Sequence, residues 1–331
     1  MRLTFPRLLL ATLALAPACC IATTAAAQTE ALASPRSAES IAEGIQLGPL
    51  DAESASIDSS VVTTGALFAL RDDVPLSVGG PHLQLLPQGL IYRTYLAGVK
   101  ESRFGGVWNY DNGNGRILDV TLGGQAPLLR YGSLSGTRPE GWQIGLEGAG
   151  QVRLDRDEES DVEATDYRFG VPITWGDAVH QTKFAFYHLS SHLGDEFLLK
   201  QPTFPRLNYS QNVLVYGHSL YPVDNWRVYG EVGFGVADEI AKPWQFQFGL
   251  EWAPEHMTGF RGAPFFAANA HLREEVDFGG SLTAQTGWAW RSSEASGLLR
   301  LGLQYYTGKN EQFSLYDDSE QKAGFGIWYD Y

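Results

Sequence analysis

The sequence predicts an all-β fold, a transmembrane up-and-down antiparallel β-barrel of about 12 strands. Three observations lead to this prediction. The chain opens with an export signal, apolar and polar residues alternate over most of its length, and it holds 9 Trp, 15 Tyr, 17 Phe and 37 Gly in 331 residues. After the signal no apolar run reaches the roughly 20 residues of a membrane helix, so strands must form any surface that faces lipid.

Residues 1–27 form the predicted signal peptide. Two arginines supply a positive start, 8–16 an apolar core, and three alanines ending at Ala27 a small-residue cleavage site. A lipoprotein signal at Cys19 is the weaker alternative, because the residues before it depart from a lipobox. Both cysteines, Cys19 and Cys20, lie in the signal, so the mature chain must be held by packing or by a closed hydrogen-bond network.

Residues 28–100 form a predicted N-terminal periplasmic segment that is partly disordered. The part 28–60 is rich in Ala, Ser and Glu with little periodicity, and we expect it to be mobile. The part 61–100 is punctuated by prolines between apolar patches. We expect it to pack beneath or inside the barrel.

Residues 101–331 form the predicted barrel. The alternation is clearest in 243–253, where one face is aromatic or aliphatic and the other carries Gln245 and Glu251. A soluble sandwich alternates too, but these segments run roughly 10 to 13 residues, enough for a tilted strand to cross a bilayer, and their second faces are too polar for a dry core. The predicted strands are 103–110, 116–125, 142–154, 164–176, 180–192, 211–221, 225–236, 243–253, 264–275, 279–291, 296–308 and 321–331.

The connections set the predicted orientation. Those after odd-numbered strands tend to be long and acidic, as at 155–163, 193–210 and 309–320, and we expect them outside the cell, with both termini in the periplasm. An aromatic girdle agrees with this topology, since Trp and Tyr favour the membrane interface. Seven such residues fall at the periplasmic strand ends: Trp142, Trp175, Tyr221, Trp226, Trp252, Trp290 and Tyr329.

The chain stops on an aromatic residue, Tyr331, after a run of alternating aromatic and aliphatic residues. This ending is similar to the C-terminal signal of outer-membrane proteins that the barrel-assembly machinery reads. We therefore expect a monomer in the bacterial outer membrane, in contact with outer-membrane lipid and lipopolysaccharide. A formal net charge of −14 argues against nucleic acid as a partner.

The stretch 183–196 carries a compact set of nucleophile, imidazoles and carboxylates. The strand period of two puts His188, Ser190 and His192 on one face. His188 could act as the base for the Ser190 hydroxyl, and a third polar group would orient the imidazole. Four nearby residues could fill that third role: Asp195, Glu196, Asn208 and Asn212.

Two other interpretations of this stretch stay open. The three polar residues could line the lumen, since alternation does not say which face is inside. A ligand or metal could instead be bound by His188, His192 and the two acids Asp195 and Glu196, although no defined metal site is predicted. His192 also belongs to a ligand-binding hypothesis with the inward charges Arg227 and Glu231.

Charged residues on the inner faces allow two interpretations. Arg153, Arg227 and Arg300, with inward acids such as Glu231 and Glu251, could brace a narrow lumen or line a selective pore. No cofactor is predicted. The acidic run 155–163 could bind Ca²⁺ through hard oxygens, but it lacks the spacing of a calcium loop, and a solvated outer loop explains it more simply.

Two resemblances add to these observations. His188-x-Ser190 is similar to the His-x-Ser arrangement of outer-membrane phospholipase A and the lipid A deacylases, whose active sites lie on the lipid-facing wall near the outer rim. Here no Ser-Asn-Gly follows the His, and the acids come sooner than in the deacylases. The chain from about Leu67 onward resembles the domain-of-unknown-function 1207 family of bacterial exported proteins, a name that implies fold and compartment but no activity. The segments that carry this second resemblance are 86–92, 97–103, 123–124, 129–132 and 187–196.

The sequence thus predicts an outer-membrane barrel and favours, by a small margin, a non-catalytic pore or structural barrel. The alternative is an ester hydrolase of outer-leaflet lipid or lipopolysaccharide. In that enzyme Ser190 would be the nucleophile, His188 the base and a nearby acid or amide the orienting group.

Overall fold

The computed structural model describes residues 80–134, 136–207, 209–236 and 241–331. The chain divides into two compact units, Met1–Asp73 and Val74–Tyr331, and the described residues all belong to the second. The predicted signal peptide, its cleavage near Ala27 and the mobile leader lie outside the described residues.

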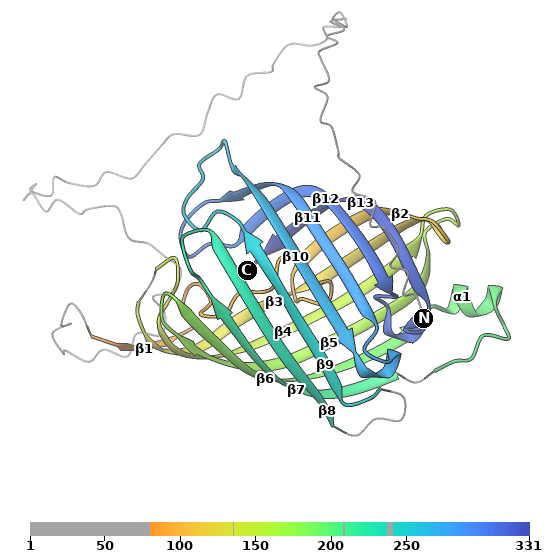
Figure 1. The fold of residues 1–331 in the computed structure, drawn as a ribbon, viewed down its shortest axis with the longest axis horizontal. Helices are drawn as coiled ribbons and strands as arrows, with labels where there is room; N and C mark the ends of the chain where they lie inside the picture. Colours follow the sequence, from red (N-terminus) through yellow and green to blue (C-terminus); the bar gives the residue numbers. More distant parts are fainter. Residues whose placement is uncertain (1–79, 135, 208, 237–240) are drawn as a thin grey trace, which may run out of the picture. The chain divides into compact units, whose positions relative to one another are not determined.

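Thirteen strands of the described part form one antiparallel sheet, and twelve of them, β2 to β13, close into a barrel (Figure 1). The strands are β1 (His82–Leu85), β2 (Phe104–Asp111), β3 (Gly115–Gly132), β4 (Gly141–Asp155), β5 (Asp161–Gly176), β6 (His180–Leu193), β7 (Tyr209–Leu220), β8 (Trp226–Val236), β9 (Trp244–Trp252), β10 (Ala263–Arg273), β11 (Gly280–Arg291), β12 (Leu298–Lys309) and β13 (Ser319–Asp330).

Closure comes from β2 and β3. β2 pairs with β13 on one side and with β3 on the other, while β3 also pairs with β4. The predicted twelve-stranded barrel is confirmed, with strand bounds within a few residues of those expected except at β3. β3 runs on to Gly132, and its last four residues pair with β1, a strand the sequence analysis did not predict.

Three short helical segments lie in the connections. α1 (Asp195–Lys200) follows β6, η2 (Glu274–Val276) follows β10, and η3 (Phe313–Leu315) lies between β12 and β13. All three fall at the end of the barrel opposite the start of β2 and the end of β13. We call that end the loop end, and the end where β2 starts and β13 finishes the terminal end. No helix in the described residues has the length and apolar character needed to span a membrane.

The alternation of the sequence becomes two different surfaces. In β9, Trp244, Phe248 and Leu250 point outward and are exposed or half-exposed, whereas Gln245 and Glu251 point inward and are buried. The arginines predicted to face inward do so, since Arg153 and Arg300 have no exposed surface. An apolar outside and a polar inside in a closed sheet is the organisation of an outer-membrane β-barrel, in which no backbone edge is left unpaired toward lipid.

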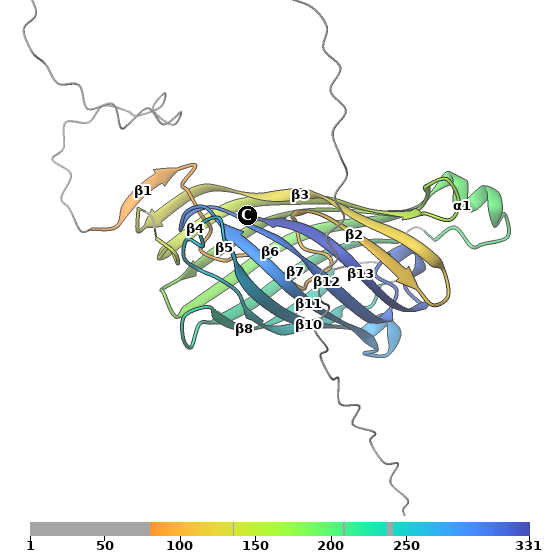
Figure 2. The ribbon, with the colours of Figure 1, turned by 90° about the horizontal axis from the view of Figure 1, so that it is seen from above.

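The segment 86–103 fills part of the lumen before β2 begins, and it runs through the inside of the barrel (Figures 1 and 2). The ring of Tyr95 stacks on that of Tyr229 at 3.8 Å between centroids, and the Tyr95 hydroxyl donates to Glu231 at 2.8 Å. The Leu96 N–H donates to Glu251 at 2.7 Å, and the Arg300 guanidinium donates to the Leu96 carbonyl at 3.0 Å. The inner charges therefore brace the lumen against this plug. Of the two positions expected for 61–100, the described residues 86–100 occupy the one inside the barrel.

Most of the predicted aromatic girdle lies on the outer surface at the terminal end. Trp142, Trp175 and Trp226 are exposed there. Tyr221 is the exception, because it is buried and its ring packs against the Arg138 guanidinium at 4.9 Å. The prediction for Tyr221 was wrong because the residue follows the end of β7, where strand alternation no longer applies.

Candidate functional site

Strand β6 carries two unlike faces near the loop end. Tyr187, Leu189 and Ser191 are buried toward the lumen, whereas His188 and His192 are exposed on the outside and Ser190 is half-buried there. The outer face continues through Phe184 and Phe186, with exposed fractions of 45% and 44%. The structure therefore answers the question that alternation left open, and His188, Ser190 and His192 face the membrane side.

Neighbouring strands place a partner beside His188. In the register of β6 and β7, His188 lies opposite Asn212, and His188 Nδ1 and Asn212 Oδ1 are 3.0 Å apart. The amide oxygen can only accept, so Nδ1 donates and Nε2 keeps its lone pair free. Of the four residues proposed to orient the imidazole, Asn212 contacts it, while Asn208 lies outside the described residues.

Ser190 is flanked by two more hydroxyl groups. It lies opposite Ser210 on β7 and opposite Tyr167 on β5, and all three side chains belong to the outer face. Side chains directly opposite each other on one face have Cβ atoms about 4.5 to 5.5 Å apart. In the described part of the chain the Ser190 hydroxyl has no hydrogen bond, and none joins it to His188.

Asp195 and Glu196 begin α1, beyond the end of β6, and both are exposed. Neither is hydrogen-bonded to His188 within the described residues. The sequence analysis proposed them because they are close along the chain. The strand pairing brings Asn212 closer in space because the loop and α1 return the chain to the same height on β7.

The ligand-binding set His192, Arg227 and Glu231 is divided by the barrel wall. His192 lies outside, with its ring 6.1 Å from that of Tyr167. Arg227 lies inside and donates to Ser219 and to the backbone carbonyls of the plug. Glu231 also faces the lumen and pairs with Lys183 at 2.7 Å. The three residues do not form one site, so that hypothesis was wrong.

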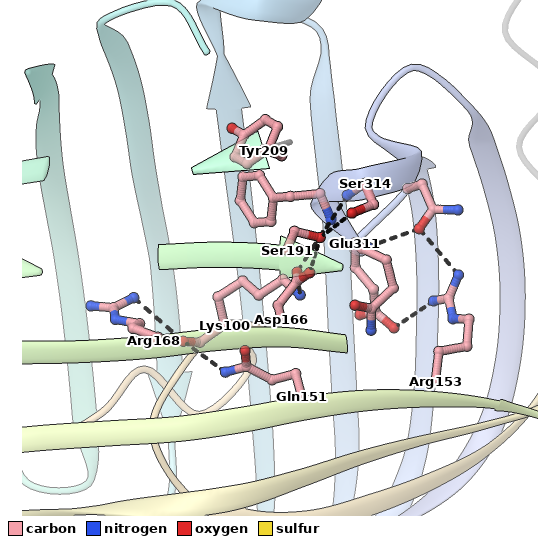
Figure 3. Close-up of polar contacts among 12 residues, drawn as sticks. Lys100, Gln151, Arg153, Asp166, Arg168, Ser191, Tyr209, Glu311 and Ser314 are labelled. Atoms are coloured by element: carbon pink, nitrogen blue, oxygen red, sulfur yellow. Dashed lines mark hydrogen bonds and ion pairs between the residues drawn. The ribbon is translucent and has the colours of Figure 1, made fainter. Parts of the chain in front are cut away.

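A dense polar network backs the candidate site on the lumen side (Figure 3). Ser191 donates to Asp166, and Ser191 Oγ accepts from the backbone N–H of Ser314 at 2.7 Å. Lys100 from the plug forms an ion pair with the same Asp166 at 2.5 Å, and the Phe313 N–H donates to it at 3.2 Å. One carboxylate thus ties together β5, β6, the plug and the loop that contains η3.

A second buried cluster lies farther along the same loop, where Arg153 and Glu311 meet at 2.9 Å (Figure 3). Lys322 also pairs with Glu311, and Asp119 and Glu320 pair with the same two cations. Three carboxylates share two cations here. Burial, and then the charge of Asp119, raises the pKa of Glu311 to about 7.

The acidic run that could bind Ca²⁺ is partly occupied by protein cations. Asp157 pairs with Arg116 at 2.6 Å, and Lys200 of α1 pairs with Asp161 at 2.9 Å and with Glu158 at 3.3 Å. Hydrogen bonds from the Arg116 backbone and side chain lower the pKa of Asp157. Among the described residues no group of three or more His, Cys, Asp or Glu is placed to hold a metal ion.

The geometry of the outer site has a definite chemical capacity. An imidazole held by an amide oxygen, with a free ring nitrogen and a serine two residues along the same face, has the parts of a nucleophile, a base and an orienting group. Sequence reasoning identified Ser190 and His188, and it included Asn212 among four candidates for the orienting group without choosing between them. A polar residue on the outward face of the next strand is the signal that would have favoured Asn212.

The barrel is similar to several solved structures. Outer membrane phospholipase A from Escherichia coli is 15% identical, with 69% of this chain and 90% of that chain covered at a TM-score of 0.46. The Salmonella typhi outer membrane phospholipase dimer with bound calcium is 13% identical, with 69% and 90% covered at 0.48. The KdgM porin is 7% identical, with 69% and 98% covered at 0.39. The sequence matches no curated protein.

A family model matches residues 54–331, which include every described strand. Its description is protein of unknown function, DUF1207. The match covers most of the chain and agrees with the resemblance seen in the sequence, and the chain belongs to the DUF1207 family.

Proposed function

We propose that this protein is a serine-dependent acyl hydrolase that cleaves ester bonds of outer-leaflet lipid. Ser190 is the nucleophile, His188 the base and Asn212 the residue that orients the imidazole. The observation that carries the proposal is the hydrogen bond between His188 and Asn212, beside Ser190, on the lipid-facing wall of the barrel.

The energetic setting supports a functional role for these residues. Polar groups that face hydrocarbon are costly and mark functional sites by default. On the neighbouring strands β8 and β9 the outward positions are apolar, as at Val228, Phe234, Phe246 and Phe248. The polar residues of β6 and β7 near the loop end interrupt that apolar surface, which supports a role for them beyond the structure of the barrel.

The proposed reaction follows from the groups present. Ser190 Oγ attacks the ester carbonyl carbon while its proton passes to His188 Nε2, and the Asn212 oxygen holds Nδ1–H as the imidazolium forms. The proton then moves to the alcohol oxygen, which leaves as the C–O bond breaks. Water, activated by the same imidazole, hydrolyses the acyl-serine to a free fatty acid and restores Ser190.

The Ser210 hydroxyl is positioned to assist this step. It lies across from Ser190 on the same face, so it can donate to the oxygen that becomes negative in the tetrahedral intermediate. Ser190 and His188 are not hydrogen-bonded to each other in the described structure. This is compatible with their proposed roles as nucleophile and base, since catalytic hydrogen bonds often tighten only when substrate binds.

The compartment and partners remain sequence predictions that this proposal uses. We place the loop end outside the cell and both termini in the periplasm, after signal removal near Ala27, with a monomer assembled through the aromatic end at Tyr331. Ester-bearing phospholipid and lipopolysaccharide then meet the site from the outer leaflet. Calcium binding at the acidic loop stays a separate prediction.

The interior gives less support to a pore. The cavities found around Arg227, Arg103 and Arg273 hold about 40, 40 and 10 Å³, far below the roughly 300 Å³ of an ordinary ligand pocket. The plug and the ion pairs of the wall contact each other across this part of the lumen. If the full chain makes a planar bilayer conduct ions, the pore becomes the favoured function.

Replacing Ser190 with Ala tests the hydrolase. We expect the wild-type protein to release fatty acid from phospholipid or lipopolysaccharide vesicles and to be labelled by a fluorophosphonate, and Ser190→Ala to lose both. Thr286→Ala removes an outward hydroxyl on β11 and is the matched control, with wild-type release and labelling expected. Equal release by the wild type and Ser190→Ala, or no release by either, would reject the proposal.

A further inference from the structure

A trough crosses the outer wall beside the candidate site. It has a volume of about 350 Å³ and is lined by glycines of β3 and β4 together with Phe104, Leu146, Phe169 and Tyr331. Phe169 lies directly opposite His188, so the trough begins one strand away from the imidazole.

Glycines make the floor of this trough. One transverse row of the sheet reads Asn212, His188, Phe169, Gly148 and Gly124 across β7, β6, β5, β4 and β3. Two consecutive positions of this row have no side chain, and Phe169 separates them from His188. A Cβ at Gly124 would meet the Tyr331 ring at 2.8 Å, so the open part of the wall lies above Gly148.

The space above Gly148 is open. A Cβ built at Gly148 would meet only the Arg168 carbonyl oxygen at 3.6 Å and the Phe169 ring at 3.8 Å, both ordinary contacts. Backbone geometry thus does not require glycine at this position, since its φ is not in the left-handed region. The glycine leaves room for something that is not part of the described chain.

We infer that the trough holds one acyl chain of the lipid that Ser190 cleaves. This inference rests on the proposed function and names the substrate class, a long-chain ester. Most of the lining is apolar, as an acyl chain needs, with Gln125 and Glu147 as the polar members. Phe169 borders the trough on one side and lies opposite His188 on the other. From the row of His188 it extends through Leu146 toward the terminal end, which is the direction of the membrane core for a headgroup held at the loop end.

Gly148→Leu tests the trough by filling it, and Gly230→Leu is the matched control. Gly230 lies on the outer face of β8, and a Cβ there meets nothing within 4 Å. We expect Gly148→Leu to lower kcat/KM for a p-nitrophenyl palmitate about 10-fold or more, the scale of a lost apolar pocket contact. Hydrolysis of p-nitrophenyl butyrate should stay unchanged, and Gly230→Leu should leave both esters unaffected.

A second readout does not depend on hydrolysis. A phospholipid with a diazirine near the end of one acyl chain is irradiated with the full-chain protein in vesicles, and the labelled peptides are identified by mass spectrometry. We expect label on the peptide that contains Leu146 above that on β8, and loss of this excess in Gly148→Leu.

The outcomes separate the two proposals. Selective labelling without any ester hydrolysis keeps the acyl trough and rejects the enzyme. Butyrate and palmitate hydrolysis falling together in Gly148→Leu, or equal effects of Gly148→Leu and Gly230→Leu, overturns the trough while leaving the enzyme in place. Uniform labelling of all lipid-facing strands also overturns it.

Discussion

Ser190 and Ser191 are neighbours in β6, and the barrel wall separates their environments. Ser191 is fully buried, donates to Asp166 and accepts from the Ser314 backbone. Ser190 lies on the other side without a hydrogen bond among the described residues, next to an imidazole that Asn212 holds. The same residue type thus has its hydrogen-bonding capacity used on one face of the strand and unused on the other.

The difference separates structural from chemical roles. A buried hydroxyl that both donates and accepts hydrogen bonds stabilises the fold, because removing it leaves its buried partners unpaired. A hydroxyl that is free beside a base can transfer its proton to that base and attack a substrate. We therefore expect changes on the outer face of β6 to affect rate, and changes on the inner face to affect stability.

The largest effect is expected at His188 on the outer face. His188→Ala should reduce fatty-acid release about 10⁴-fold, because it removes the base to which the proposal assigns the Ser190 proton. The unfolding midpoint of the detergent-solubilised barrel should move little. His218→Ala, which removes an outward imidazole near the terminal end of β7, should retain full activity. Comparable loss in both variants would show that the effect is not local to the site.

The largest stability effect is expected at Asp166 on the inner face. Asp166→Ala leaves Lys100 buried without its partner, and breaking a buried pair in this way costs about 3 to 5 kcal/mol. Urea unfolding in detergent measures the change, and turnover per folded molecule should stay within a few-fold of wild type. Glu158→Ala, which breaks an exposed pair with Lys200, should cost less than about 0.5 kcal/mol. A turnover loss at Asp166 as large as at His188 would contradict the division between the two faces.

The barrel could be predicted because strand alternation, length and aromatic strand ends all indicate the same arrangement. The face of β6 on which Ser190 lies could not be predicted from the sequence. Tyr187 and Leu189 on the opposite face are as apolar as a lipid-facing pair, yet they are buried inside, where the Tyr187 ring packs against the Arg168 guanidinium at 4.0 Å. Alternation indicates that the two faces of a strand differ. Because the plugged lumen accepts aromatic residues, polarity does not show which face of β6 points inward.

The position of Asn212 also could not be predicted from the sequence. Its position opposite His188 depends on the register of β6 and β7, and that register depends on how the 15 residues between Leu193 and Tyr209 return the chain. α1 takes up part of that loop, and nothing local in the sequence fixes the height at which β7 starts. Residues close along the chain, Asp195 and Glu196, were therefore proposed on equal terms with one that is close in space.

A smaller effect on rate is expected at Asn212. Asn212→Ala should lower kcat about 10²-fold, less than loss of the base, because a neutral amide stabilises the imidazolium less than a carboxylate does. Asn212→Asp should restore much of the activity and move the acid limb of the pH–rate profile to higher pH, since an anion favours the protonated ring. A purely structural asparagine predicts the same rate loss in both variants and an unmoved profile.

The smallest effect is a pH dependence of stability from the inner cluster at Glu311. Burial, followed by Asp119, raises its pKa from 4.5 to about 7, so the folded protein holds a proton that the unfolded chain releases between these values. The contribution is fully present below about pH 4.5 and is lost as the pH rises through about 7, at roughly 1.4 kcal/mol for each unit of difference between the folded and unfolded pKa.

Glu311→Gln keeps this position neutral and should flatten the decline in the free energy of unfolding between pH 5 and 7. Urea unfolding of both proteins in detergent at several pH values measures the slope. Glu158→Gln, on an exposed loop, should leave the wild-type slope unchanged. Because Glu311 lies in the loop that backs β6 from the lumen, the ester-hydrolysis rate per folded molecule should not follow this slope. A rate that tracks it would mean that the inner network and the outer site are coupled through the wall.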